Sequence, residues 1–121
     1  MKRVIRAATS ENMRKVHVPV SHGPGMKYMI NVEQDLDHGF FAGQLVKIAP
    51  YDDADYVWAK VDWNGLVKFI KNGKVIDKSQ LWSYEEDDYE SVDEYFDDAI
   101  DQLILDLEEY NSKIKPRMIH N

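Results

Sequence analysis

The stretch 56-YVWAKVDWNGLVKFIKNGKVI-76 decides the fold, because three short runs of strand-forming residues alternate in it with two Asn-Gly pairs. Asn-Gly between hydrophobic runs is the strongest short-range indication of a β-hairpin. The three runs are therefore expected to pair as a β-meander over 56–77, with strands at Tyr56–Trp63, Leu66–Ile70 and Val75–Asp77.

The register of this meander follows from its turns. A two-residue turn at Asn64-Gly65 places Val61 opposite Lys68, and one at Asn72-Gly73 places Lys68 opposite Asp77, which predicts an ion pair between these strands. One face is then apolar and is expected to form the core: Val57, Ala59, Val61, Trp63, Leu66, Ile70 and Val75. The other face is mixed: Trp58, Lys60, Asp62, Val67, Phe69 and Ile76.

A long amphipathic helix is predicted near the C-terminal end, over about 91–115. Ser91 and Glu94 have the spacing of a capping box. Apolar residues then recur in steps of three and four, which is typical of one buried helix face: Phe96, Ile100, Leu103, Leu107, Tyr110 and Ile114. Pro116 is expected to stop this helix, which would pack across the meander.

The N-terminal half is expected to add further strands. The predicted elements are a strand over 2–8, a short helix from Thr9 or Ser10 to Lys15, an edge strand around Pro19, a strand over 26–33 and an apolar segment over 40–48. The whole chain, 1–121, is then a single α+β domain with an antiparallel sheet of four to six strands packed by one long helix.

Composition excludes several classes of protein. The chain has no cysteine, so it has no disulfide framework and no thiolate metal site. Its hydrophobic content of 44% allows a real core. No apolar run is long enough to span a membrane, and the basic N-terminus lacks the apolar stretch of a signal peptide. We therefore expect a cytoplasmic protein.

The net charge of -7 is concentrated in one segment. Residues 79–112 hold 13 acidic residues and no lysine or arginine, whereas the segments before and after it each carry a small positive excess. Several carboxylates follow one another at helical i,i+4 spacing, where like charges destabilise a helix. A row such as Asp93, Asp97 and Asp101 rises ~6 Å per step, which is compatible with imitation of a phosphate strand.

This acidic segment is the predicted partner-binding surface. The residues assigned to it are Glu85, Glu86, Asp87, Asp88, Asp93, Glu94, Asp97, Asp98 and Asp101. An ordinary solvated helix face is the competing interpretation, and the order of residues 83–90 is left open. The basic residues Lys2, Arg3, Arg6, Arg14 and Lys15 either touch phosphates or pair with the protein's own acidic helix.

The sequence contains no recognised catalytic or metal-binding motif. Phosphate-binding glycine loops, nucleophile elbows and zinc spacings are absent from the sequence. Asp35, Asp37 and the Asp52-Asp53-Ala-Asp55 run do not match a calcium loop, and aspartates of this kind usually form turns. We therefore predict no catalytic residue, no metal and no cofactor. Three aromatic residues offer a weaker alternative, a stacking platform for single-stranded nucleic acid: Trp58, Trp63 and Phe69.

In overall character the sequence resembles the small acidic proteins of phages and mobile elements in low-GC bacteria. It begins MKRVIRAATSE, has strands joined by Asn-Gly turns and ends in a carboxylate-rich helix. More narrowly, it is similar to anti-CRISPR proteins, several of which are acidic α+β chains that occupy a nucleic-acid site on Cas9. The resemblance covers no aligned motif, so it assigns no residue a role.

Three functional interpretations follow. The first is a non-enzymatic inhibitor in the cytoplasm of a bacterial host, whose acidic, DNA-mimicking helix binds a basic nucleic-acid enzyme such as Cas9. The second is a generic interaction module that uses the mixed face at Trp58 and Phe69. The third is a nucleic-acid-binding protein or nuclease that uses the basic N-terminus or an aspartate site. Direct binding of nucleic acid is not expected under the first interpretation.

Overall fold

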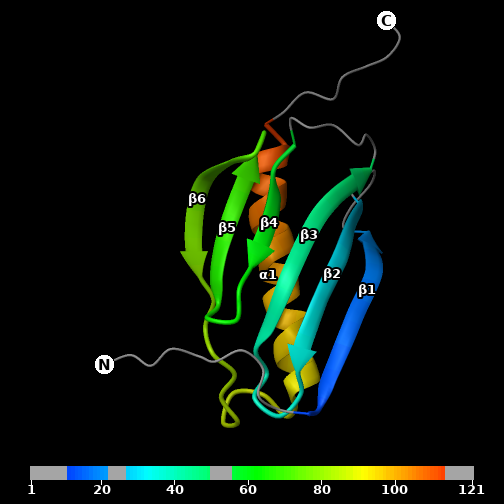
Figure 1. Cartoon of the computed structure of the whole chain (residues 1–121), viewed down its shortest axis with the longest axis vertical. Helices are drawn as coiled ribbons and strands as arrows, with labels where there is room; N and C mark the ends of the chain where they lie inside the picture. Colours follow the sequence, from blue (N-terminus) through cyan, green and yellow to red (C-terminus); the bar gives the residue numbers. More distant parts are fainter. Residues whose placement is uncertain (1–10, 22–26, 50–55, 114–121) are drawn as a thin grey trace, which may run out of the picture.

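In the residues that the computed structural model describes, 11–21, 27–49 and 56–113, six β-strands form one antiparallel sheet in sequence order. A long helix crosses one face of this sheet (Figure 1). The elements are β1 (Met13–Ser21), β2 (Lys27–Asp35), β3 (Phe41–Ala49), β4 (Trp58–Val61), β5 (Leu66–Lys71), β6 (Lys74–Gln80) and α1 (Val92–Asn111). The expected α+β fold is confirmed.

The turn between β4 and β5 is longer than predicted, because Asp62 closes it. The N–H of Asp62 donates to the carbonyl of Leu66 (3.1 Å), and the N–H of Gly65 donates to the carbonyl of Asp62 (2.9 Å). The Asp62 carboxylate accepts from the N–H groups of Asn64 (2.8 Å) and Leu66 (3.1 Å). Gly65 has φ +80°. The loop Trp63-Asn64-Gly65 therefore has three residues, with glycine in the left-handed position.

This loop moves β5 by one residue from the predicted register. Val61 lies opposite Val67 and Ala59 lies opposite Phe69, whereas the predicted register pairs Val61 with Lys68. A shift of one residue exchanges the two faces of a strand. Val67 and Phe69 are consequently buried in the core, at 0% and 2% exposure, and their predicted place on the mixed face is wrong.

The second Asn-Gly pair forms the predicted two-residue turn. Asn72 and Gly73 have φ of 53° and 78°, as a type I′ hairpin requires. Ile70 lies opposite Val75 as predicted. Val75 is nevertheless exposed (46%), because β6 is the outer strand of the sheet.

The predicted ion pair between Lys68 and Asp77 is wrong. A register shift between β5 and β6 places Asp77 opposite Phe69, on the face that the helix covers, and Lys78 opposite Lys68. Asp77 instead accepts a hydrogen bond from the hydroxyl of Tyr110 on α1. Lys68 therefore lies on the opposite, helix-free face of the sheet.

The helix α1 packs its apolar side on the sheet, as the periodicity predicts. Ser91 is its N-cap, and the Ser91 hydroxyl accepts from the N–H of Glu94 (3.3 Å). Seven hydrophobic residues of α1 are buried. Four belong to the predicted stripe, namely Phe96, Ile100, Leu103 and Leu107, and the other three are Tyr95, Ala99 and Ile104. Tyr110 is half-buried, and Ile114 lies outside the described residues.

The helix ends earlier than predicted. Its last residue is Asn111, and the N–H of Ser112 still donates to Glu108 (2.8 Å), whereas the N–H of Lys113 reaches Tyr110 (3.4 Å) in a tighter i to i+3 bond. Such a tightened turn satisfies carbonyls that the helix end would leave unpaired. The expected stop at Pro116 lies outside the described residues.

The N-terminal half differs from its prediction in one element. Met13 to Lys15 belong to β1, which pairs with β2 over nine residues, so the end of the expected short helix is strand, and its start at Thr9 or Ser10 lies outside the described residues. Pro19 lies on this edge strand, where a missing N–H is tolerated. β2 and β3 cover the predicted segments, and the predicted strand over 2–8 lies outside the described residues.

A buried asparagine fastens the end of the helix to the sheet. The Asn111 side chain is 2% exposed, and its carbonyl accepts from the N–H of Val57 (2.7 Å). Its amide donates to the carbonyl of Val57 (3.1 Å) and to the hydroxyl of Tyr28 (3.2 Å). One side chain therefore satisfies both backbone groups of Val57 next to β4.

Replacement of Asn111 by alanine is expected to destabilise the protein by at least about 2 kcal/mol, because it leaves two buried backbone groups without a partner. Urea denaturation measures this change in the free energy of unfolding. The exposed change Lys113→Ala is the control and should cost little. Equal stability of Asn111→Ala and the wild type would contradict the role given to this side chain.

Candidate acidic interaction surface

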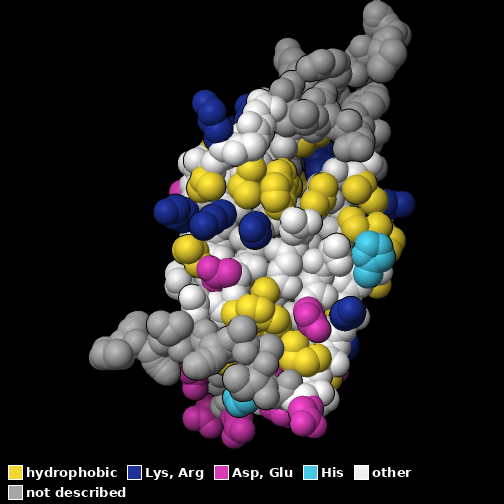
Figure 2. Space-filling model, in the orientation of Figure 1, with side chains coloured by type: hydrophobic (Ala, Val, Ile, Leu, Met, Phe, Trp, Pro, Cys, Tyr) yellow, Lys and Arg dark blue, Asp and Glu magenta, His cyan; other side chains and the backbone are white. Residues whose placement is uncertain are grey.

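All nine carboxylate side chains assigned to the acidic surface are exposed. They form two adjoining groups, one in the turn that precedes α1 and one on the first three turns of the helix. Figure 2 shows acidic side chains gathered at the end of the molecule where α1 begins. The nine predicted residues therefore lie on adjoining parts of the exposed surface.

An aromatic cluster orders the acidic turn, whose order the sequence left open. Tyr84 and Tyr89 flank the four acidic residues and pack on Tyr95, with ring centroids 5.9 and 5.6 Å away. The Tyr95 hydroxyl donates to the carbonyl of Trp82. Burial raises the pKa of Tyr95 to about 12. The regular interleaving of tyrosines with acidic residues was the sequence signal for this cluster.

Asp98 is held by a short chain of hydrogen bonds. The indole N–H of Trp82 donates to the hydroxyl of Tyr89 (2.9 Å), and that hydroxyl donates to the Asp98 carboxylate (2.8 Å). The chain links the helix surface to the acidic turn. The two groups of carboxylates are therefore fixed relative to each other.

Glu94 takes part in the helix cap. Its carboxylate accepts from the N–H of Glu90 (3.0 Å). The side-chain bond of the capping box therefore goes to the residue before Ser91. A negative charge in the first turn is also favoured by the helix dipole. The charge of Glu94 is thus partly used to stabilise the start of α1.

Asp93 differs from the other surface carboxylates because it has a cationic partner. Arg14 on β1 forms a salt bridge with it (2.8 Å) and donates to the carbonyl oxygen of the Gln34 side chain (2.6 Å). The Arg14 guanidinium also lies 5.4 Å from the ring centroid of Phe96. The expectation that the basic residues pair with the acidic helix is confirmed for Arg14. The predicted row of Asp93, Asp97 and Asp101 is correspondingly weakened at Asp93.

Asp97 and Asp101 are the two helix carboxylates of the surface that have no partner among the described residues. Both are exposed, and no other residue in the described ranges forms a hydrogen bond or ion pair with their carboxylates. They lie one helical turn apart, ~6 Å along the axis. Their mutual repulsion costs about 0.2–0.5 kcal/mol, and no contact with another described residue offsets this cost. These two residues are the centre of the surface.

Asp35, one of the aspartates weighed as a cation ligand, binds the backbone of its own turn instead. Asp35 is 2% exposed, and its carboxylate accepts from the N–H groups of Asp37 (2.9 Å) and His38 (3.3 Å) and contacts the His38 Nδ1 (3.0 Å). The described part of the chain contains no group of three or more residues placed to hold a metal. The run 52–55 lies outside the described residues.

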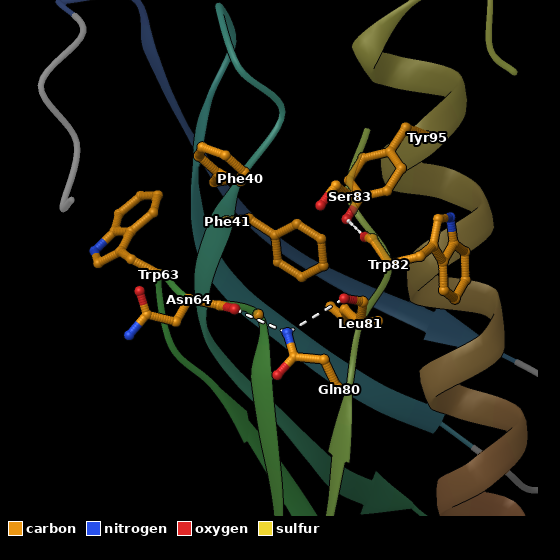
Figure 3. Close-up of a pocket in the computed structure, with 10 residues that line it drawn as sticks. Phe40, Phe41, Trp63, Asn64, Gln80, Leu81, Trp82, Ser83 and Tyr95 are labelled. Atoms are coloured by element: carbon orange, nitrogen blue, oxygen red, sulfur yellow. Dashed lines mark hydrogen bonds between the residues drawn. The ribbon is translucent and has the colours of Figure 1, made fainter. Parts of the chain in front are cut away.

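The three aromatic residues of the alternative stacking platform do not form one. Phe69 is in the core, and its ring centroid lies 5.1 Å from that of Tyr110. Trp58 lies on the opposite face of the sheet. Trp63 lines a crevice of about 30 Å³ together with Phe41 and Tyr95 (Figure 3). This crevice is far too small for a nucleic-acid base.

Comparison of the chain with protein-family models, with curated proteins and with solved structures gives no match. Within the described residues no helix has the length and apolar character that a bilayer crossing requires.

His38 gives the acidic end of the molecule a pH-dependent contribution to stability. The hydrogen bond that the His38 ring donates to the Asp35 carboxylate, and then the charge of that carboxylate, raise the pKa of His38. The folded state therefore favours the protonated form. This contribution is fully present below the pKa of an unfolded histidine, about 6.5, and is lost as the pH rises through the higher folded pKa.

His38→Gln is therefore expected to lower the melting temperature at about pH 5.5 and to change it much less at about pH 9. Thermal denaturation at both pH values measures the effect, and His17→Gln at an exposed strand position is the matched control. The same loss of stability at both pH values would show that the His38–Asp35 pair contributes no charge interaction.

Proposed function

We propose that this protein is a non-enzymatic inhibitor that binds a basic nucleic-acid enzyme through its acidic surface. The observation that carries the proposal is the pair Asp97 and Asp101, which are exposed and have no ionic partner in the described ranges, on a helix whose opposite side is buried. A helix adapted only for solubility would place lysines between such carboxylates, and α1 has none. Glu94, Asp98 and the acidic turn extend the surface.

The inhibitor acts by occupying a site that nucleic acid would use. Enzymes such as Cas9 read their target with arginines and hold nucleic acid in positive channels. Carboxylates on a rigid element form short, charge-assisted hydrogen bonds to arginine, with two-pronged geometry where the fork fits. The fixed relation between α1 and the acidic turn favours this mode, because little conformational entropy is lost on binding.

The proposed location is the cytoplasm of a bacterial host, where such an enzyme works. Association would be accelerated by the field of the acidic end and would weaken as salt shortens its range. The interaction-module alternative is less favoured, because Phe69 is buried and cannot join Trp58 on a binding face.

Reversal of Asp97 and Asp101 to lysine is expected to weaken partner binding by at least about 30-fold, since the loss of even one charged pair at an interface costs about 2 kcal/mol or more. The matched control is Glu11→Lys with Glu109→Lys, which changes the net charge equally at other exposed sites. Guide-loaded Cas9 serves as the defined probe in an interferometry assay.

Capture from a bacterial lysate complements this probe. The wild type is expected to retain a basic nucleic-acid-binding protein at about 0.1 M salt and to release it at about 1 M, where screening is nearly complete. The Asp97 and Asp101 reversal should retain none, with an unchanged melting transition. Equal capture by the reversal and the wild type would contradict the proposed surface.

A further inference from the structure

Six polar side chains lie in one straight row across the helix-free face of the sheet, one on each strand. The strand registers place each member directly opposite the next, from β1 to β6. With strands about 4.8 Å apart, the row spans about 24 Å. Its members are His17, Asn31, Gln44, Lys60, Lys68 and Lys78.

Half of this row is an uncompensated basic patch. Lys68 lies opposite Lys60 on one side and opposite Lys78 on the other. Like charges directly opposite each other destabilise a sheet. In the described ranges no carboxylate forms an ion pair with any of the three. Figure 2 shows lysine and arginine side chains close together on this face, over the side of the sheet that β4–β6 form.

In the described part of the chain, the carboxylates nearest to the lysine row form no ion pair with it. Glu33 and Asp62 lie in the neighbouring row, toward the acidic end of the molecule. The Asp62 carboxylate is occupied by the N–H groups of its own loop, at 2.8 and 3.1 Å. Asp77, the predicted partner of Lys68, is on the other face.

An apolar row runs beside the polar one, about 7 Å away. Its members lie two residues from those of the polar row on β1 to β5 and three residues away on β6, because of the register shift between β5 and β6. The strand registers join Pro19 to Met29 and Val46, and Trp58 to Ile70 and Val75. Figure 2 shows hydrophobic side chains as a band above the basic ones. Trp58 is half-buried and neighbours Lys60 on β4.

We propose that this face binds single-stranded nucleic acid laid across the strands. The phosphates lie on the lysines, Gln44 and Asn31 donate to the backbone or to base edges, and a base stacks on Trp58. A polynucleotide is complementary to both rows. Its phosphates form a regular line of negative charge, and its planar, largely apolar bases lie at a fixed offset from that line. An acidic polypeptide matches only the charged row.

This site is independent of the acidic surface, because it uses the other face of the sheet. It differs from the inhibitor interpretation, under which direct binding of nucleic acid is not expected. The predicted register would have paired Lys68 with Asp77, whereas the observed register puts Lys68 between two other lysines.

The test is fluorescence anisotropy of a labelled oligothymidylate of about 12 nucleotides with the full-length protein. Three lysine contacts predict that the logarithm of the binding constant falls with the logarithm of the salt concentration with a slope of about −2. The triple variant Lys60→Gln, Lys68→Gln, Lys78→Gln should lose this binding. Trp58→Ala should weaken it about tenfold without changing the slope, because stacking is not electrostatic.

A matched triple variant separates the row from net charge. Lys15→Gln, Lys27→Gln, Lys113→Gln removes the same charge at other positions and should leave the affinity within about twofold of the wild type. The row variant should also melt at a higher temperature than the wild type, because removal of opposed like charges relieves repulsion. This second measurement shows that the row variant is folded.

Three results would overturn the proposal. They are absence of oligonucleotide binding by the wild type, undiminished binding by the row variant, and equal losses in both triple variants. Sedimentation supplies a fourth. Self-association that the row variant abolishes, without oligonucleotide binding, would assign the face to the acidic helix of a second copy.

Discussion

The carboxylate of Asp62 sets the constraint on which the rest of the structure depends. By binding two N–H groups of its own loop it makes the turn three residues long, and Gly65 supplies the left-handed backbone that this turn needs. The loop length fixes the register of β5. That register decides which residues of the central strands meet the helix and which face away from it.

Charge is segregated on the two sides of the fold as a consequence. On one side α1 buries its apolar stripe and turns its carboxylates outward. On the other side Lys60, Lys68 and Lys78 stand in line. Both groups cost stability in the isolated protein, and neither is neutralised by the other, because the sheet separates them. The two proposed binding sites share one property, which is a set of like charges on a rigid element without a paired opposite charge in the described residues.

The sequence predicted those features that depend on local pattern. The helix start at Ser91, its buried face and the Asn72-Gly73 turn all follow from spacing. The sequence-based prediction failed at two places. The Asp62 side chain lengthened the turn between β4 and β5, and a register shift between β5 and β6 placed Asp77 and Lys68 on opposite faces of the sheet. The position of the acidic residues could be predicted, but the salt bridge of Asp93 with Arg14 could not, because it joins segments far apart in the chain.

Nuclear magnetic resonance of the β4–β5 hairpin tests the central claim most directly. Cross-strand Hα–Hα contacts report which residues lie opposite each other in an antiparallel pair. Contacts are expected between Val61 and Val67 and between Ala59 and Phe69. A contact between Lys60 and Phe69 in their place would restore the two-residue turn, and it would contradict both the observed core and the lysine row.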